Sequence, residues 1–471
     1  MNIVLIWAWW TGISSLWFLF TQLWYNNIIW IDSTESQITK ALQSNGVKVI
    51  LWHGVYQVQA GDLVIYSDAA PQAPEVIQTK ERVLQEVKWA RPPLSYFQFL
   101  WEISKLFETI SIAGTHGKST TSAMLTYTMS QSDPMFWLGI LGALVPQLNN
   151  TNYRLNPAIK DDIATIFTFI LTGNYKIRDE SLRKKYRFVI EADEFNRHFL
   201  YLDTDYAIIL NAELDHSDIY PNEQIYMDTF IEFTHKVKKQ IFVLPWEKWI
   251  EYIIKHWPSN IVQVNKQYID LPFVFGDHVQ KNASLNIALL DYIIKEAPVI
   301  ASEAKQSTLQ AMKSFKGLRR RMELLKTYDN GWLLYSDYWH HPTEIKAVLD
   351  AFREKFPTKK LVAIFQPHQA RRVLEFRQDF ASTMQWFDEA IIYDIYTARE
   401  DLTELLQTFP TKQEYSIWSV DELWEHFAQD SKAIYTKDFD TITSRIEKIT
   451  SDEVICIFTA GNLDFKVRNY L

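Results

Sequence analysis

The sequence contains almost no cysteine: among its 471 residues, Cys456 is the only one. A single thiol excludes an intramolecular disulfide framework and a cysteine-rich metal site. The surrounding segment 454–458 is otherwise apolar, and such a run predicts a buried strand. We therefore expect Cys456 to be a core thiol and not a nucleophile.

An excess of basic charge is also missing. The chain has 48 Lys and Arg residues against 57 Asp and Glu, a formal charge of -9, which argues against a nucleic-acid-binding protein. With 47% hydrophobic and 22% charged residues, the composition fits a soluble globular protein and excludes disorder, collagen and coiled coil. The length predicts roughly three domains.

Glycine is scarce, with 13 residues, whereas tryptophan is abundant, with 18. Glycine alone normally makes up about 7% of a protein, and here the two residue types together reach about that share. The balance indicates that some tryptophans occupy positions where glycine is expected.

Charged side chains are absent from the first 31 residues. The mostly apolar stretch 3–24 is long enough to span a bilayer, which would predict a signal anchor or a transmembrane helix. However, no basic segment precedes it and no Lys or Arg occurs before Lys40, so the usual flanking signals are missing.

A nucleotide-binding turn explains this region better. Residues 2–6 predict a buried strand, and segment 7–12 becomes Gly-Ala-Gly-Gly-Thr-Gly if its three tryptophans are replaced by glycine. That is the fingerprint of a Rossmann-type strand–turn–helix unit. A second apolar run, 28–31, ends in Asp32, where an acidic residue typically contacts a ribose hydroxyl.

Tryptophan cannot perform the task of glycine in this turn, because the turn needs left-handed backbone and bare main chain close to a diphosphate. We hypothesise that the source reads UGA as glycine and that the printed sequence follows a table that reads it as tryptophan. Real tryptophans in a degenerate site are the alternative, which UGG codons would establish. The positions that motivate the hypothesis are Trp7, Trp9, Trp10, Trp30, Trp52 and Trp339.

A second nucleotide site is predicted after residues 109–113, which form an apolar strand pattern. The following segment matches the end of a P-loop, although Ile112 occupies the position of the first glycine of the strict motif. Lys118 would neutralise the β- and γ-phosphates of ATP, and Ser119 would offer a hydroxyl to Mg²⁺. The predicted ATP-binding loop comprises Gly114, Thr115, His116, Gly117, Lys118, Ser119 and Thr120.

This loop resembles that of the Mur ligases, and the resemblance extends over nearly the whole chain. It implies an α/β fold of three domains: a Rossmann-like UDP-sugar domain (1–107), a P-loop ATPase domain (108–316) and a Rossmann-like C-terminal domain (317–471). His116 favours the branch that joins L-alanine to the lactyl carboxylate of UDP-N-acetylmuramate, with ATP, through an acyl phosphate, in peptidoglycan precursor synthesis. The implied UDP-sugar contacts are Gly12, Ser14, Asp32 and His53.

Two carboxylate-rich segments, 191–194 and 215–218, follow apolar strand patterns. Acidic groups at strand ends behind a P-loop predict Mg²⁺ held between protein and phosphate, with solvated acidic loops as the alternative. The resemblance implies that Glu191 and His216 are metal ligands together with Ser119.

Further ATP contacts are implied by two other segments. Residues 276–282 resemble the adenine-contact segment of the family and retain Asn282, while Val279 replaces an expected asparagine. Residues 315–323 resemble the junction before the C-terminal domain. That match places Arg320 and Arg321 near ATP or the acyl phosphate, and arginine suits phosphate because it binds two oxygens at once.

The amino-acid site is implied by segments 336–344 and 365–368, which resemble the family's D-Y-G-H-H-P-T-E and F-Q-P-H. Gln369 and Ala370 depart from the common pattern, which leaves alanine specificity open. A zinc site at the adjacent histidines would need at least three protein ligands, which the sequence does not specify. The implied amino-acid contacts are Tyr338, His341, His368 and Arg372, and the implied catalytic residues are Lys118, His341 and Arg372.

These patterns predict an ATP-dependent carboxylate–amine ligase with UDP-N-acetylmuramate and L-alanine as substrates. We expect a cytoplasmic monomer or weak homodimer without nucleic-acid partners or membrane insertion. Two alternatives stay open: a murein-peptide ligase acting on the same nucleotide sugar, and a membrane-anchored, non-catalytic nucleotide-binding protein.

Overall fold

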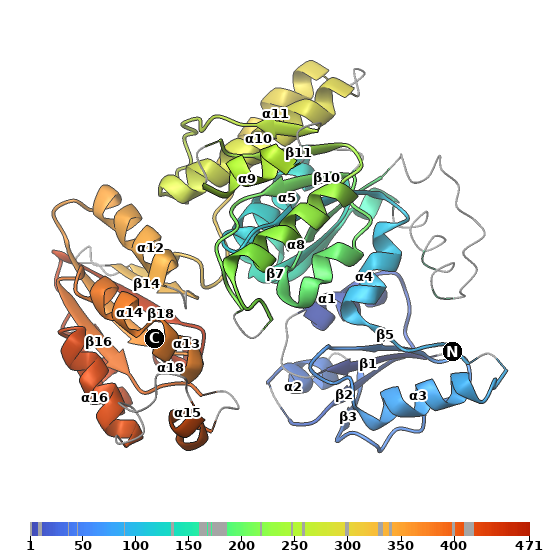
Figure 1. Ribbon diagram of the computed structural model, residues 1–471, viewed down its shortest axis with the longest axis horizontal. Helices are drawn as coiled ribbons and strands as arrows, with labels where there is room; N and C mark the ends of the chain where they lie inside the picture. Colours follow the sequence, from blue (N-terminus) through green and yellow to red (C-terminus); the bar gives the residue numbers. More distant parts are fainter. Residues whose placement is uncertain are drawn as a thin grey trace. The chain divides into compact units, whose positions relative to one another are not determined.

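The computed structural model of the chain is an α/β structure with three separate sheets (Figure 1). The chain folds into two compact units, residues 1–270 with 281–315 and residues 271–280 with 316–471, and each unit is described by itself. The structure describes residues 2–7, 12–35, 37–44, 46–88, 90–132, 136–159, 167, 171, 186–216, 219–245, 248–256, 260–296, 301–327, 333–338, 342–397, 401–408 and 419–471.

The first sheet has five parallel strands in the order β3-β2-β1-β4-β5. Its central strands are continuous apolar runs because helices cover both faces of a parallel sheet. The order reverses between β1 and β4, so a crevice is expected at their carboxyl ends. The elements are β1 (Ile3–Trp7), α1 (Gly12–Gln22), β2 (Ile28–Asp32), α2 (Gln37–Ser44), β3 (Lys48–Leu51), β4 (Leu63–Tyr66), α3 (Pro74–Leu84), β5 (Leu94–Ser95) and α4 (Tyr96–Ser104).

The second sheet has seven strands in the order β12-β11-β10-β6-β9-β7-β8, all parallel except the β7–β8 pair. Its strands are β6 (Glu108–Ala113), β7 (Phe136–Val145), β8 (Thr151–Leu155), β9 (Arg187–Glu191), β10 (Tyr206–Ile209), β11 (Gln240–Val243) and β12 (Ile261–Gln263). Its helices are α5 (Lys118–Ser132), η1 (Pro146–Leu148), η2 (Pro157–Ile159), η3 (Phe195–Tyr201), α8 (Glu223–Lys236), α9 (Lys248–His256), α10 (Asp277–Glu296) and α11 (Ala301–Lys313).

The third sheet has six strands in the order β13-β14-β18-β15-β16-β17, and only the β13–β14 pair is antiparallel. Its strands are β13 (Glu323–Thr327), β14 (Leu333–Asp337), β15 (Lys360–Gln366), β16 (Glu389–Tyr393), β17 (Ile434–Thr436) and β18 (Glu453–Thr459). Its helices are α12 (Pro342–Lys355), α13 (Ala370–Glu375), α14 (Arg377–Met384), α15 (Leu402–Thr408), α16 (Val420–Asp430), α17 (Phe439–Glu447) and α18 (Leu463–Tyr470).

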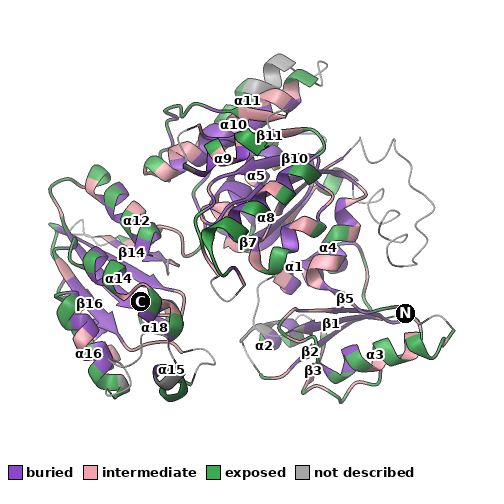
Figure 2. Cartoon of the chain, in the orientation of Figure 1, coloured by how far each residue is buried: buried purple, intermediate pink, exposed green. Residues whose placement is uncertain are grey.

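The strands form the buried centre of each unit, coloured purple in Figure 2. The first two sheets share one apolar core, in which Phe20 of α1 packs against Phe99 of α4 and Phe167. This shared core explains why two compact units contain three sheets. Cys456 is buried in the middle of β18, and burial raises the pKa of its thiol, so the prediction of a core thiol is confirmed.

No described helix is long and apolar enough to cross a membrane. The apolar stretch near the N-terminus forms strand β1 and helix α1, whose Leu16, Leu19 and Phe20 are buried. These apolar residues face a protein core, as the strand–turn–helix interpretation of the stretch expects.

Four of the described tryptophans show two contrasting settings. Trp52 (φ 79°) and Trp24 (φ 63°) have left-handed backbone and are 66% and 56% exposed. A bulky residue there is an outlier, whereas glycine adopts such backbone freely. Trp30 in β2 and Trp424 in α16 are completely or almost completely buried, and their geometry carries no sign of a glycine position. Trp9, Trp10, Trp339 and the side chain of Trp7 lie outside the described residues.

We expect Trp52→Gly to raise the free energy of unfolding by up to about 1 kcal/mol, because relief of left-handed strain outweighs the added flexibility of the unfolded chain. The contrasting variant is Trp424→Gly, which empties a packed site and should cost about 3–5 kcal/mol. Denaturant unfolding followed by fluorescence measures both. A loss of stability in Trp52→Gly would contradict the assignment of position 52 as a glycine site.

Candidate active site

The phosphate loop connects the carboxyl end of β6 to the start of α5. Gly114 (φ 138°) and Gly117 (φ 86°) have backbone that favours glycine, and a Cβ on Gly114 would lie 3.0 Å from the Leu210 Cβ. Because α5 begins at Lys118, the N–H groups of its first turn have no acceptor within the helix. They form an anion site where the helix dipole is positive.

The front of the loop is held by side chains from α8 and from the segment after β10. The Asn211 Oδ1 accepts a hydrogen bond from the His116 N–H (2.8 Å), and the Thr115 hydroxyl lies 2.8 Å from the Tyr226 hydroxyl. The same Thr115 hydroxyl donates to the Glu213 carbonyl (2.7 Å). Thr115 and His116 therefore shape the loop, which leaves the helix start to face the phosphates.

Lys118 forms a buried ion pair. Its Nζ donates to the Glu194 Oε2 (2.7 Å) and to the Gly114 carbonyl (2.6 Å), and the Glu194 side chain is only 1% exposed. Burial alone would lower the pKa of Lys118, but the neighbouring carboxylates, Glu194 foremost, outweigh it and raise that pKa. For Glu194, Lys118 outweighs burial and lowers the pKa. Both groups are charged, so an incoming phosphate competes with Glu194 for the lysine.

Glu191, the last residue of β9, accepts hydrogen bonds from three donors beside this ion pair. Its Oε2 accepts a hydrogen bond from Ser119 (3.0 Å), and its Oε1 accepts bonds from Ser122 (2.9 Å) and the Gly142 N–H (2.5 Å). A hydroxyl and a carboxylate in contact are hard oxygen ligands of the kind that Mg²⁺ takes together with phosphate and water. Ser119 and Glu191 thus fit the predicted metal site.

His216 contacts Glu194 (3.7 Å) and Asp215 (3.8 Å). The described residues contain no cluster of three or more His, Cys, Asp and Glu side chains placed to hold a metal. The role of His216 as a metal ligand therefore stays a prediction. Burial, and next the charge of Glu194, raise the pKa of Asp193 to about 6, so this edge of the sheet is crowded with negative charge.

Asn282 of α10 backs the phosphate loop: its Nδ2 lies 3.3 Å from the place that a Cβ on Gly117 would take. Val279, one turn earlier, is 3% exposed and belongs to the core. Asn282 is thus placed at the ATP loop, while its predicted contact with adenine stays a prediction.

The predicted UDP-sugar residues lie along the carboxyl edge of the first sheet. Gly12 begins α1, Asp32 ends β2, and His53 follows β3, with its Nδ1 3.6 Å from the Glu75 carboxylate. Burial raises the pKa of Asp32, against hydrogen bonds and the nearby His53. The Ser14 Oγ accepts a long hydrogen bond (3.5 Å) from Asn152 of β8. Gly12, Asp32 and His53 thus follow or end neighbouring strands of the first sheet, while their contact with a UDP-sugar, and that of Ser14, stays a prediction.

In the second unit, the two predicted arginines lie beside Tyr338. The Arg320 guanidinium is 4.6 Å and that of Arg321 5.4 Å from the Tyr338 ring centroid. Arg320 also donates hydrogen bonds to the Thr459 (2.6 Å) and Gly461 (3.3 Å) carbonyls. Arg320 thus anchors the turn after β18 to the predicted amino-acid site, and a phosphate contact of either arginine stays a prediction.

His368 stacks on Tyr396 with 5.7 Å between ring centroids and 11° between planes. Burial, followed by the positive charges of Arg372 and Arg320, lowers the pKa of His368 to about 4. The imidazole is therefore neutral at pH 7, and Arg372 is the nearby cation that an amino-acid carboxylate would meet. His341 lies outside the described residues.

Gln366 organises the end of β15. Its Oε1 accepts hydrogen bonds from the Thr459 hydroxyl (2.7 Å) and the Leu463 N–H (2.9 Å), and its Nε2 donates to the Asn462 Oδ1 (3.0 Å). These contacts join β15, β18 and α18 at the place where the predicted amino-acid residues emerge. The glutamine of the F-Q-P-H segment therefore has a structural role: it holds the ends of β15 and β18 and the start of α18 together.

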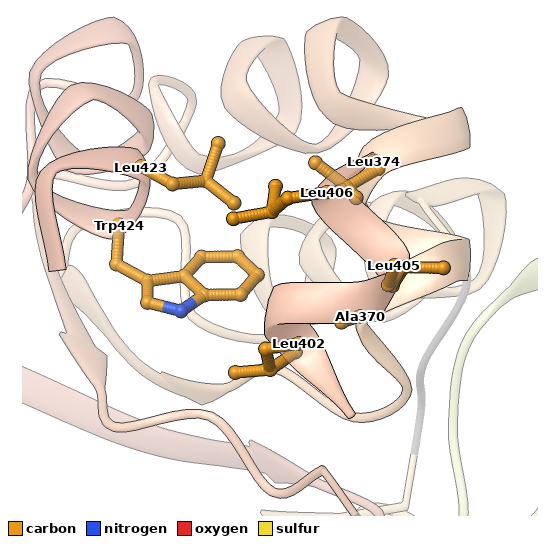
Figure 3. A pocket seen from close by; sticks show the side chains of 7 residues that line it. All are labelled: Ala370, Leu374, Leu402, Leu405, Leu406, Leu423 and Trp424. Atoms are coloured by element: carbon orange, nitrogen blue, oxygen red, sulfur yellow. The ribbon is translucent and has the colours of Figure 1, made fainter. Parts of the chain in front are cut away.

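Ala370 lies on the apolar side of α13. It is fully buried and lines a small cavity whose leucines and indole converge in Figure 3. At this position, where the chain departs from the family pattern, the side chain is therefore part of the apolar core. The cavity is lined by Ala370, Leu374, Leu402, Leu405, Leu406, Leu423 and Trp424.

Several contributing residues carry no local sequence signal. Tyr226 supports Thr115 from 111 positions away, and Ser122 reaches Glu191 across 69 positions. Glu194 stands in the acidic segment 191–194, but its pairing with Lys118 depends on how β9 lies beside β6. The only signal for this pair is the general expectation that a buried carboxylate has a cationic partner.

A glycine-bearing phosphate loop, a helix that starts with Lys-Ser and buried carboxylates in contact with both define a P-loop nucleotide-binding protein of the α/β class. Residues 112–270 match the Mur ligase middle domain, and residues 320–461 match the Mur ligase glutamate ligase domain. A UDP-N-acetylmuramate–L-alanine ligase of Cytophaga hutchinsonii is 30% identical, with 96% of this chain and 92% of that one covered. The chain belongs to the Mur ligase family.

Solved structures agree on the fold. The chain matches a crystal structure of UDP-N-acetylmuramate-alanine ligase from Thermotoga maritima with a TM-score of 0.70 at 18% identity, covering 100% of this chain and 98% of that one. It matches a murein peptide ligase from Psychrobacter arcticus with a TM-score of 0.62 at 20% identity, covering 99% and 97%. The predicted α/β fold, with its three sheets, is confirmed.

We expect Lys118→Ala to lower ATP hydrolysis about 100-fold or more, because it removes the charge that meets the phosphates. The variant also deprives the buried Glu194 of its lysine partner and leaves it only the contact with His216, which should cost up to about 3–5 kcal/mol of stability. The double variant Lys118→Ala/Glu194→Gln is the control: it should regain thermal stability without regaining hydrolysis. Recovery of hydrolysis in the double variant would contradict the assigned role of Lys118.

We expect the His368 ring resonance to titrate near pH 4, below the ordinary pKa of 6.5. Because the unfolded chain takes up this proton at higher pH than the folded one, stability falls as the pH drops from 6.5 to 4, by on the order of 2 kcal/mol. An NMR titration measures the pKa, and His368→Asn identifies the resonance. Titration near 6.5 would show that His368 is not buried beside the arginines.

Proposed function

We propose that the protein is an ATP-dependent ligase that joins L-alanine to the lactyl carboxylate of UDP-N-acetylmuramate. The observation that carries the proposal is the group formed by Lys118, Ser119 and Glu191, a phosphate cradle and a metal-type carboxylate in direct contact. The end-to-end similarity to L-alanine ligases of this family supports the choice of substrates.

The reaction needs activation because a carboxylate is a poor electrophile. A carboxylate oxygen attacks the γ-phosphorus, and the bond between this phosphorus and the oxygen that bridges it to the β-phosphate breaks. ADP departs, and an acyl phosphate is formed. The alanine nitrogen then attacks the acyl carbon, phosphate leaves, and the nitrogen gives up a proton. Lys118 and the first-turn amides of α5 stabilise charge in the phosphoryl transfer, which consists mainly of positioning and electrostatics.

Mg²⁺ would neutralise phosphate oxygens during this transfer. Ser119 and Glu191 are the groups that would hold it, and His216 is the third ligand that the family resemblance implies. In the C-terminal region, Tyr338, His341, His368 and Arg372 would orient the amino acid. The organisation into domains 1–107, 108–316 and 317–471 is part of the same proposal.

The protein would act in the cytoplasm, where its nucleotide substrates are found, as a monomer or weak homodimer. A murein-peptide ligase is the competing function, since an enzyme of that name shares the fold. Gln369 replaces a common family residue beside His368, so the incoming amine is the substrate to vary in the assay.

The decisive assay measures ADP release as a function of both co-substrates. We expect hydrolysis only when UDP-N-acetylmuramate and an amine are both present, with alanine preferred over glycine, serine and the tripeptide. The chain carrying Trp7→Gly, Trp9→Gly and Trp10→Gly should be active, while the printed chain should not bind UDP, because indoles fill the turn.

A preference for the tripeptide would establish the murein-peptide ligase instead. Hydrolysis that does not depend on the nucleotide sugar would refute the proposed reaction. Activity of the printed chain equal to that of the triple variant would remove the glycine hypothesis and leave the ligase assignment in place.

A further inference from the structure

Two polar side chains near the first sheet, one buried and one partly exposed, are not used by the reaction described above. Asp68 lies just beyond the carboxyl end of β4, and His198 lies on η3, beside the second sheet. The His198 Nε2 is 3.7 Å from the Asp68 Oδ2, and the side chains are 7% and 32% exposed. The pair thus joins the edge of one sheet to a segment of the next.

The pair is held firmly but is incompletely satisfied. The His198 ring stacks on Phe97 of α4, with 3.8 Å between centroids and 16° between planes. The Ser95 side chain hydrogen-bonds to the Asp68 carboxylate, but within the described part of the chain neither the His198 Nδ1 nor the Asp68 Oδ2 has a hydrogen-bond partner. Because the Asp68 side chain as a whole is 32% exposed, its carboxylate keeps acceptor capacity that a ligand donor can use.

The ionisation states agree with this geometry. Burial raises the pKa of Asp68 to about 6, and burial lowers the pKa of His198 to about 4. At neutral pH the pair is therefore a carboxylate beside a neutral imidazole. A second anion, such as a phosphate oxygen, would be repelled by Asp68, so the group that meets this carboxylate is a hydrogen-bond donor and not a phosphate oxygen.

The strand order indicates which part of the nucleotide sugar supplies this donor. Strand β1 lies between β2 and β4, and adjacent strands are about 4.8 Å apart. Asp32 at the end of β2 and Asp68 beyond β4 therefore flank the start of α1, where the diphosphate is expected. A nucleotide sugar has the same order, with its ribose on one side of the diphosphate and its amino sugar on the other.

The side with Asp68 is the side that leads to the ATP loop. η3 follows directly on the acidic segment 191–194, and the Phe199 N–H donates to the Asp193 carbonyl (2.8 Å). Glu194 in that segment pairs with Lys118. Because the lactyl carboxylate must reach the γ-phosphate, the amino sugar has to lie on this side and the ribose on the side of Asp32.

We propose that Asp68 is a specificity residue that accepts a hydrogen bond from a hydroxyl or amide N–H of the amino sugar. His198 is its positioning residue, which holds the carboxylate and connects it to the acidic segment beside Lys118. This inference rests on the proposed function, since it assigns an end of the same nucleotide sugar.

The test compares UDP with UDP-N-acetylmuramate by titration calorimetry on the full chain, in the triple-glycine form described above. We expect Asp68→Asn, which keeps the side-chain shape, to weaken UDP-N-acetylmuramate binding by about 10- to 100-fold, the usual contribution of a hydrogen bond to a charged group. Its affinity for UDP should stay unchanged. Glu81→Gln, on the exposed side of α3, is the matched control and should alter neither affinity.

The role of His198 is tested by steady-state kinetics. His198→Phe keeps the stack on Phe97 but lacks a donor, and it should raise KM for the nucleotide sugar several-fold while kcat and KM for ATP stay near wild type. His198→Gln keeps an N–H near the position of Nε2 and should restore KM. Equal KM values for His198→Phe, His198→Gln and wild type would overturn this role.

The remaining outcomes distinguish a failure of the Asp68 assignment from a failure of the proposed function. If Asp68→Asn and Asp68→Ala bind UDP-N-acetylmuramate as wild type does, or lose UDP affinity equally, the assignment of Asp68 is overturned while the ligase function stands. If the chain with the pair intact binds UDP but gains nothing from the amino sugar, the proposed function fails, and this inference fails with it.

Discussion

The buried ion pair between Lys118 and Glu194 connects the two segments on which the central site is built. Lys118 begins α5, and Glu194 ends the acidic segment after β9, so the pair fixes the helix start against the neighbouring strand end. Glu191 lies in the same segment and collects Ser119 and Ser122 from the first turns of α5. Together with the pairing of β6 and β9, this ion pair aligns the phosphate loop with the carboxylates. The segment continues without a break into η3, so the same backbone leads on to the edge of the first sheet.

Local pattern was sufficient for the phosphate loop, the strand before it and the acidic strand end, because each is encoded within about ten residues. It was insufficient for the partners of these groups. Asn211, Tyr226 and Glu194 contact the loop across 76 to 111 positions, and such pairings depend on sheet order. Strand order in turn depends on which apolar faces pack, which the alternation of residues does not reveal.

The tryptophans show a second limit of prediction from sequence, because the pattern alone does not separate turn positions from core positions. Sequence pattern treated Trp30 and Trp52 alike, since both precede residues of the predicted nucleotide edge. The structure separates them: Trp30 fills the core of β2, whereas Trp52 stands exposed on left-handed backbone next to His53. The left-handed backbone supports the glycine hypothesis at position 52, and the burial of Trp30 lends it no support at position 30.

Charge distribution in the second unit sets how an amino acid can be recognised there. Arg320 is committed to the Thr459 and Gly461 carbonyls, and His368 is held neutral by burial and by positive neighbours. In the proposed amino-acid site a carboxylate would gain no ionic contact from the neutral His368, so an arginine such as Arg372 is the cation that the proposal needs. The neutral imidazole is suited instead to exchange a hydrogen bond with an uncharged or amine group.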